Sequence, residues 1–250
     1  MPDFLFSIII PSINTSIVSL IDSLEKQSFP KKDFEVIIIK DSDNPMSFSN
    51  TTLNIKALNV DITNPSLMRN LGIDQSKGSI LAFIDDDAEA FEDWLLKASS
   101  IFKDLSDLAI LAGPAIISIE APFREKLSYE MAHAKFFGNG HDNLSSDTAS
   151  PRKLIGHINS CNLFIKKDAL LKIKAKFNTA LGYGGEDTLL IQQFLKAKYK
   201  ILYSCDVKVY HRRRKFGMAL LKQKFIYRIN NGLMLWVKPG IYFNNLKFSI

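Results

Sequence analysis

Three adjacent aspartates, Asp85, Asp86 and Asp87, follow an apolar stretch that ends at Ile84. Neighbouring carboxylates repel one another unless water or a cation separates them. If the chain stays extended here, the side chains of Asp85 and Asp87 share one face and that of Asp86 points away. Paired oxygen ligands suit Mg²⁺ or Mn²⁺, which commonly take further ligands from water and substrate phosphates. The triplet therefore indicates either a metal site for phosphate chemistry or a hydrated acidic turn.

A second acidic pair, Glu186 and Asp187, follows the glycine-rich residues 182–185 at the start of a predicted helix. The helix dipole stabilises acids in a first turn, which explains the pair without any function. Alternatively, the glycines let the backbone approach a substrate closely, and one carboxylate takes a proton from a hydroxyl nucleophile. Both interpretations stay open on these residues alone.

Basic side chains supply the third group of candidates. His211 opens the sequence HRRR, and Arg69 lies on a helix predicted after Asn64 and Pro65. A histidine at a strand end is either a surface residue or a ligand. The arginines are either solvated or neutralise phosphates, for which the guanidinium fork is well shaped.

Short apolar runs predict the strands that must position these side chains. Runs rich in β-branched residues are typical of strands covered on both faces, as in parallel sheets. We predict strands at residues 5–10, 36–39, 54–60 and 79–84. Apolar residues at helical spacing predict a helix between the first two strands, capped by Thr15 or Ser16. Asn64 is expected to cap a second helix, with Pro65 at its first position.

The resulting order β-α-β-β-α-β predicts a doubly wound α/β sheet, whose ligands bind beyond the carboxyl ends of the strands. Residues 11–14, 40–43 and 85–87 follow three of these strands. Farther along, residues 120–152 lose periodicity and suggest a mobile segment or lid. Regular structure is predicted to return as a strand at 158–165, a helix at 186–197 and a strand at 201–209.

Composition limits the class of protein. The 250 residues carry a net charge of +6, with 46% apolar and 23% charged residues, which excludes a disordered chain. The two cysteines, Cys161 and Cys205, form no disulfide framework or zinc spacing, so we interpret both as buried thiols in a reducing, cytosolic compartment. We expect neither a signal peptide nor a membrane-spanning segment.

Together these residues resemble the family 2 glycosyltransferases of the GT-A fold, over about residues 6–212. The first strand and turn of that family are similar to SIIIPSIN, and its second strand with an acidic turn to EVIIIKDSD. Its Arg-Asn-x-Gly helix, following strand and Asp-x-Asp motif resemble NPSLMRNLGIDQSKGSILAFIDDDAEAFEDWL. Its acceptor-side strand resembles GHINSCNLFIKKDAL. Its Gly-Gly-Glu-Asp helix and Tyr-His strand resemble FNTALGYGGEDTLLIQQFLKAKYKILYSCDVKVYH.

The resemblance implies an α/β fold of the GT-A, Rossmann-like type, with a mixed, mostly parallel sheet flanked by helices. Asp41 would contact the nucleotide base, Asp85 would face the ribose or a metal, and Arg69 would lie near the nucleotide. The implied donor-binding residues are Pro11, Asn14, Asp41, Arg69, Asp85 and Asp86.

The resemblance also implies the residues for metal binding and catalysis. Asp87 would hold the Mn²⁺ or Mg²⁺ that bridges the diphosphate, with Asp85 and His211 as further ligands. Asp187 would be the general base, and Glu186 would shape the acceptor pocket. Because a divalent cation stabilises a departing diphosphate, one base is enough for a single displacement with inversion.

The implied function is metal-dependent transfer of one sugar from a UDP- or GDP-sugar to a glycan or lipid-linked acceptor, in the synthesis of a lipopolysaccharide, capsule or exopolysaccharide. The chain departs from the family at Lys40, where an acid is frequent, at Asp43, where serine is frequent, and at Ile13, where an aromatic residue is frequent. It also lacks the Gln-x-x-Arg-Trp signature of processive synthases. Two alternatives are a nucleotidyltransferase acting on sugar phosphates and a catalytically silent nucleotide-binding member.

We expect a catalytic domain at residues 1–213, with a donor half at about 1–118 and an acceptor half at about 119–213. Residues 214–250 are expected to form a helical extension that packs on the core or, with its basic residues, lies on anionic lipid. The expected location is cytoplasmic, with or without peripheral contact at the inner face of the membrane. No nucleic acid partner is expected.

Overall fold

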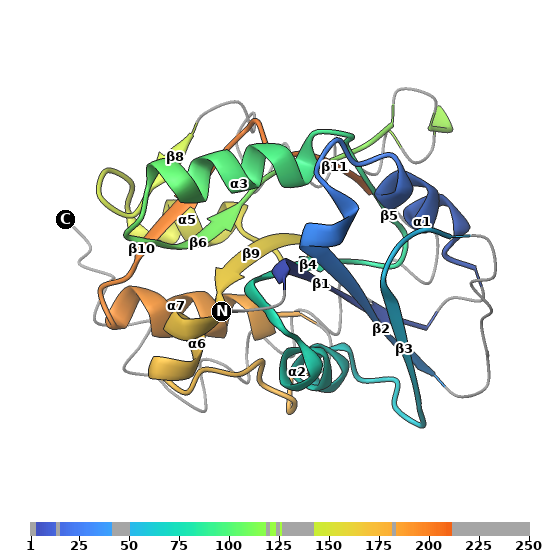
Figure 1. Cartoon of the computed structure of the whole chain (residues 1–250). Coiled ribbons are helices and arrows are strands. Elements are labelled where there is room, and N and C mark those ends of the chain that lie inside the picture. The colour runs from blue at the N-terminus through green and yellow to red at the C-terminus, as the bar shows by residue number, and fades with distance from the viewer. Residues whose placement is uncertain are drawn as a thin grey trace.

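Buried strands form the central sheet of this chain (Figure 1). The computed structural model describes residues 4–13, 16–41, 51–118, 121–123, 126, 143–181 and 184–211, apart from the side chain of residue 152. Within them, eight strands lie side by side in the order β3-β2-β1-β4-β9-β6-β10-β8. Their bounds are β1 (Phe4–Ser12), β2 (Phe34–Asp41), β3 (Ile55–Val60), β4 (Gly78–Ile84), β6 (Leu108–Ala112), β8 (Leu144–Ser145), β9 (Asn162–Lys166) and β10 (Lys200–Tyr203).

The directions of the strands explain where the acidic residues gather. Strands β3, β2, β1 and β4 are parallel, and β9 runs antiparallel between β4 and β6. At the far edge β10 is parallel to β6, and β8 is antiparallel to β10. The carboxyl ends of β1, β2 and β4 therefore meet at one edge of a mixed, mostly parallel sheet, as the strand pattern predicts.

Helices cover both faces of the sheet, as Figure 1 shows. Side chains alternate along β1, so Ile8 packs in the cluster with α1 (Val18–Glu25) and α3 (Trp94–Asp104), while Ile9 packs in the opposite cluster. That opposite face is covered by α2 (Pro65–Gln75), α6 (Lys167–Lys172) and α7 (Glu186–Lys196), and α5 (Pro151–His157) packs against α7. A short 3₁₀ turn, η1 (Lys31–Asp33), precedes β2.

The two predicted helix caps have different outcomes. The Asn64 side chain accepts a hydrogen bond from the Leu67 N–H at 3.1 Å, with Pro65 at the first helical position, so this cap is confirmed. Helix α1 instead has Ile17 at its cap position and no capping side-chain bond, so Ser16 does not cap it. Ile17 is buried in the core, and packing rather than a polar cap fixes the start of this helix.

The predicted strand at 201–209 is wrong as a single element. It divides into β10 in the large sheet and β11 (Val209–His211), which lies between β5 (Ala88–Ala90) and β7 (Ala115–Ile116) in a second, three-stranded sheet. Between β10 and β11 the backbone at Val207 passes close to Gly113, where an added Cβ would lie 1.8 Å from the Val207 carbonyl oxygen. Only glycine permits this close approach, which redirects the chain into the second sheet.

The strand predicted at 158–165 starts later than expected, because Asn159 forms a turn. The Asn159 side-chain oxygen accepts a hydrogen bond from the Cys161 N–H at 3.1 Å, and β9 begins only at Asn162. The interpretation of both cysteines as buried is right for Cys161 and wrong for Cys205, which is half-buried; neither forms a disulfide.

Some predictions fall outside the described residues. These are Asn14, Thr15, Asp43, most of residues 120–152, residues 182–183 and residues 212–250 with the proposed C-terminal extension. Within the described parts, no helix combines the length and the apolar character needed to cross a bilayer.

Candidate active site

The aspartate triplet occupies a turn between β4 and β5. The Ala88 N–H donates to the Asp85 carbonyl at 3.1 Å, so the extended geometry considered for this segment is wrong. The turn nevertheless separates the side chains as expected. His211 Nε2 lies 3.0 Å from Asp87 Oδ1 and 3.8 Å from Asp85 Oδ2, whereas Asp86 accepts a hydrogen bond from the Ile13 N–H at 2.9 Å.

His211 reaches the triplet through the second sheet. It pairs with Ala88 across the antiparallel β5–β11 ladder, so the residue directly after the triplet fixes its position. Burial alone would lower the pKa of His211, but Cys161 and the Asp87 carboxylate outweigh burial and raise it well above the ordinary value. The structure therefore brings two carboxylates and one imidazole together at the end of β4.

Arg69 connects this group to the second acidic pair. Its Nη2 donates to Asp85 Oδ1 at 3.0 Å, and its Nη1 donates to Glu186 Oε1 at 3.1 Å. The side chain is only 5% exposed and its guanidinium carbon lies 5.4 Å from the centre of the Phe177 ring. Burial lowers the pKa of Arg69, but the charges of Asp85 and Glu186 outweigh it, and the guanidinium stays charged.

Glu186 and Asp187 lie in the first turn of α7, which follows two glycines with positive φ. Gly184 has a φ of 90° and Gly185 a φ of 92°, a conformation that favours glycine over other residues. Glu186 is buried, and its Oε2 atom has no hydrogen-bond partner among the described residues. Buried polar atoms are normally paired, so such an atom is expected to meet water or a ligand.

Asp187 is half-buried and electrostatically unusual. Burial raises the pKa of Asp187 to about 7, and the charge of Glu186 acts in the same direction. Backbone N–H groups of Thr188 and Ser160 and the charge of Arg69 oppose this shift. A carboxyl group with a pKa near 7 can both accept and release a proton at neutral pH, which is the property required of a general base.

The other predicted donor residues lie at the ends of β1 and β2. Pro11 is buried within β1 and pairs with Ile39, and Asp41 is the last residue of β2. Lys40 is 1% exposed and its Nζ donates to Ser12 Oγ at 3.4 Å. Burial lowers the pKa of Lys40, while the charges of Asp86 and Asp41 act against this. The charges of Asp41 and Asp86 therefore both act on the buried amino group of Lys40.

Sequence reasoning missed Cys161 as a member of the site. Its Sγ atom, a ring nitrogen of His211 and a carboxylate oxygen of Asp85 all lie within 4.8 Å of one another. The register between β4 and β9 explains this, because Asn162 pairs with Ile84 and Cys161 therefore lies beside Asp85. No sequence motif marks this thiol as a site residue, and only the antiparallel pairing of β4 and β9 places it there.

Asn162 was also missed, and it holds the loops behind the site. Its Oδ1 accepts a hydrogen bond from Trp94 Nε1 at 2.9 Å. Its Nδ2 donates to the carbonyl oxygens of Pro114 at 3.1 Å and Val207 at 2.8 Å. Asn162 therefore anchors the segment that leads into β11 and His211.

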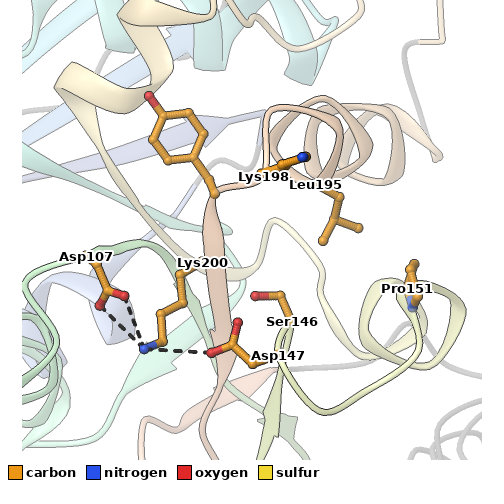
Figure 2. Close-up of a pocket in the computed structure, with 8 residues that line it drawn as sticks. Asp107, Ser146, Asp147, Pro151, Leu195, Lys198 and Lys200 are labelled. Atoms are coloured by element: carbon orange, nitrogen blue, oxygen red, sulfur yellow. Dashed lines mark hydrogen bonds and ion pairs between the residues drawn. The ribbon is translucent and has the colours of Figure 1, made fainter.

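A separate hollow of about 470 Å³ lies at the opposite edge of the sheet (Figure 2). Its lining includes Asp107, Asp147 and Lys200, whose Nζ lies 3.3 Å from Asp107 Oδ2 and 3.8 Å from Asp147 Oδ2. Lys200 begins β10 and Asp107 precedes β6, so the hollow lies at the amino ends of these strands. None of the predicted site residues lines it.

Residues 7–172 match the sequence profile of Glycosyl transferase family 2. The chain belongs to this family. The match includes Arg69 and the aspartate triplet, whereas Glu186, Asp187 and His211 lie beyond it. Family membership confirms the resemblance, the fold class and the glycosyltransferase class of enzyme, and it favours that class over a nucleotidyltransferase.

Named relatives agree with the family 2 assignment. The chain is 25% identical over 245 residues to Glycosyltransferase AglE of Haloferax volcanii, covering 94% of this chain and 75% of AglE. It superimposes on Staphylococcus aureus TarS 1-349, solved with UDP-GlcNAc, with a TM-score of 0.66 at 19% identity, covering 92% of this chain and 66% of TarS 1-349.

A second solved structure shares the fold. It is the mannosyltransferase PcManGT from Pyrobaculum calidifontis, solved with GDP-Man and Mn²⁺, with a TM-score of 0.62 at 17% identity. The match covers 88% of this chain and 60% of PcManGT. The chain thus spans no more than 66% of the length of these two solved proteins.

Proposed function

We propose that this family 2 chain transfers a single sugar from a UDP- or GDP-sugar to an acceptor hydroxyl, with inversion and with a divalent cation. The observation that carries the proposal is the chain of contacts from Asp87 through His211, Asp85 and Arg69 to Glu186. It connects the proposed metal ligands at the end of β4 to Glu186, which precedes the proposed general base Asp187.

The residues at the end of β4 fit a divalent cation. Asp85 and Asp87 offer oxygen ligands and His211 an imidazole nitrogen, and His211 Nε2 lies 3.8 Å from Asp85 Oδ2 and 3.0 Å from Asp87 Oδ1. Bound there, Mn²⁺ or Mg²⁺ would offset the charge that develops on a departing diphosphate. The solved neighbour PcManGT contains Mn²⁺ with GDP-Man, which supports the same type of donor and cation for this chain.

Asp187 is proposed as the general base. Its pKa of about 7 lets the carboxylate take the proton of an acceptor hydroxyl at neutral pH. The hydroxyl oxygen would then attack the anomeric carbon from the face opposite the diphosphate, which gives inversion in one displacement. Glu186 would shape the acceptor pocket, and Arg69 is a positioning residue that holds Asp85 and Glu186 in place.

The donor would lie along the carboxyl ends of β1, β2 and β4. Asp41, Asp86 and Pro11 lie at or near these ends, and we retain them, with Asn14 and Arg69, as proposed donor-binding residues. The proposed halves, about 1–118 for the donor and about 119–213 for the acceptor, follow from this arrangement. Lys40 is buried where the family often has an acid, so the proposal names both UDP- and GDP-sugars as donors.

The proposed acceptor is a glycan or a lipid-linked glycan of a surface polymer. AmsB of Erwinia amylovora, 32% identical over 117 residues, is named for amylovoran biosynthesis. TarS is named as a poly(ribitol-phosphate) β-N-acetylglucosaminyltransferase. A cytoplasmic location is part of the same proposal. Residues 214–250 either pack on the core or add peripheral membrane contact, and vesicle flotation with and without anionic lipid separates these alternatives.

A thermal-shift panel tests the proposed donor and cation together. We expect a UDP- or GDP-sugar near 100 times its Kd to raise the Tm by roughly 5 °C or more with Mn²⁺ and by less without it. Asp87→Ala should remove the Mn²⁺-dependent part. Asp104→Ala, an exposed acid at the end of α3, is the matched control and should behave as the wild type. If neither a UDP- nor a GDP-sugar shifts the wild type with Mn²⁺, the proposal fails.

A further inference from the structure

Cys161 gives the proposed cation site a ligand that a hard-cation site does not need. Its thiol is free and 5% exposed, and it belongs to the cluster of Asp85, Cys161 and His211. Mg²⁺ and Mn²⁺ prefer oxygen ligands, whereas one sulfur, one imidazole nitrogen and one carboxylate oxygen suit Zn²⁺. The other thiol, Cys205, is not part of this cluster.

The geometry of the cluster is close to that of a zinc site. Zn²⁺ bonds of about 2.0 to 2.3 Å place neighbouring tetrahedral ligands roughly 3.3 to 3.8 Å apart. His211 Nε2 and Asp85 Oδ2 are already 3.8 Å apart, and the Cys161 ligand atom lies within 4.8 Å of both partners.

The thiol does not need to be ionised beforehand. A coordinating metal ion binds the thiolate and the neutral imidazole, so on binding the proton of the Cys161 thiol and any proton on the coordinating nitrogen of His211 pass to solvent.

We propose that Asp85, Cys161 and His211 form a binding site for a thiophilic divalent cation, which is Zn²⁺ in the cell. A cation bound there excludes the Mn²⁺ or Mg²⁺ of the transfer reaction. Only the expected effect on sugar transfer rests on the proposed function. His211 and Asp85 are ligands in both proposed sites, so one chain cannot hold both cations at once. Micromolar Zn²⁺ would then inhibit transfer even when Mn²⁺ is present. The binding itself is independent of any sugar donor.

Cadmium provides a direct measurement, because a thiolate bound to Cd²⁺ gives a charge-transfer absorption band in the ultraviolet. The untagged full chain is titrated with Cd²⁺, and separately with Zn²⁺ and Mn²⁺ by calorimetry, without a donor. The wild type and the matched control Cys205→Ser should both show the band, with an intensity that corresponds to one Cd²⁺-bound thiolate per chain. Cys161→Ser should lose the band and bind Zn²⁺ at least about tenfold more weakly, while its Mn²⁺ affinity changes much less.

His211→Ala provides a second variant that keeps both thiols, and it should also weaken Zn²⁺ binding by about tenfold or more. A band that persists in Cys161→Ser, or a wild type that shows none, would overturn the inference. Because these readouts need neither donor nor turnover, they can fail while Mn²⁺-dependent donor binding is observed. The opposite result, Cd²⁺ binding that depends on Cys161 without Mn²⁺-dependent donor binding, would reject the proposed function and support the thiophilic site.

Discussion

Arg69 Nη2 donates to Asp85 Oδ1 at 3.0 Å, and this bond joins helix α2 to the end of strand β4. The other amino group of the same guanidinium binds Glu186 at 3.1 Å, on the first turn of α7. The buried guanidinium of Arg69 therefore compensates the charge of carboxylates from both parts of the proposed site. The geometry of the site and the stability of the fold depend on the same side chain.

Removing Arg69 should be costly. Arg69→Ala leaves the buried Glu186 without its compensating charge, and we expect the free energy of unfolding to fall by about 3 to 5 kcal/mol. Urea unfolding followed by circular dichroism measures this. Lys176→Ala, which removes an exposed ion pair with Asp74 at 3.6 Å, is the control and should change stability by less than about 1 kcal/mol. Equal small losses in both variants would show that the Arg69 contacts are not important for stability.

Replacing Asp187 should separate binding from transfer. Asp187→Asn keeps the size of the side chain but cannot accept the hydroxyl proton, so we expect turnover to fall by about 10²- to 10⁴-fold. Donor binding by thermal shift should stay near the wild-type value, since the proposed donor ligands are elsewhere. Turnover that matches the wild type would reject Asp187 as the base.

The pH dependence of the rate should follow the same carboxyl group. The pKa of Asp187 is about 7, so the fraction of ionised base, and with it the wild-type turnover at saturating donor, should rise between pH 6 and pH 8. The residual rate of Asp187→Asn should lack this rise. A wild-type rate that is flat over this interval would place the base elsewhere.

Stability should change with pH in the opposite direction. The pKa of Asp187 is raised from 3.8 to about 7 by burial, so the folded state holds a proton that the unfolded chain releases. Its contribution to stability is fully present below about pH 4 and is lost as the pH rises through about 7. Relative to Asp187→Asn, the wild type should therefore lose unfolding free energy between pH 5 and pH 8. Parallel stability profiles for the two proteins would contradict the raised pKa.

Asn162 should matter for the cation as well as for the fold. In Asn162→Asp the new carboxylate faces the carbonyl oxygens of Pro114 and Val207, which lose their donors. We expect a loss of at least about 2 kcal/mol in urea unfolding and weaker Mn²⁺ binding by calorimetry, because the segment leading to His211 is released. Asn178→Asp, at an exposed turn, is the control. Unchanged Mn²⁺ affinity in Asn162→Asp would limit Asn162 to a purely structural role.

The local pattern of the sequence was enough for the first half of the fold. Buried β-branched runs, the Asn64 cap with Pro65 and the acidic strand end at Asp85 are all decided by residues close together in the chain. They predicted the parallel strands, helix α2 and the edge of the sheet where the acids gather. The cap of α1 was the exception, because burial of Ile17 replaced a polar cap.

Only the tertiary structure decided which distant side chains meet. The approach of Val207 to Gly113 directs His211 into a second sheet, and the antiparallel register of β9 places Cys161 beside Asp85. Arg69 contacts Glu186 although 117 positions separate them in the chain. Strand order, strand direction and close backbone approach are long-range packing choices, which residue type and spacing along the chain do not encode locally. The sequence by itself therefore determined the candidate chemistry and the family it resembles, and the packing determined which of those groups act on one another.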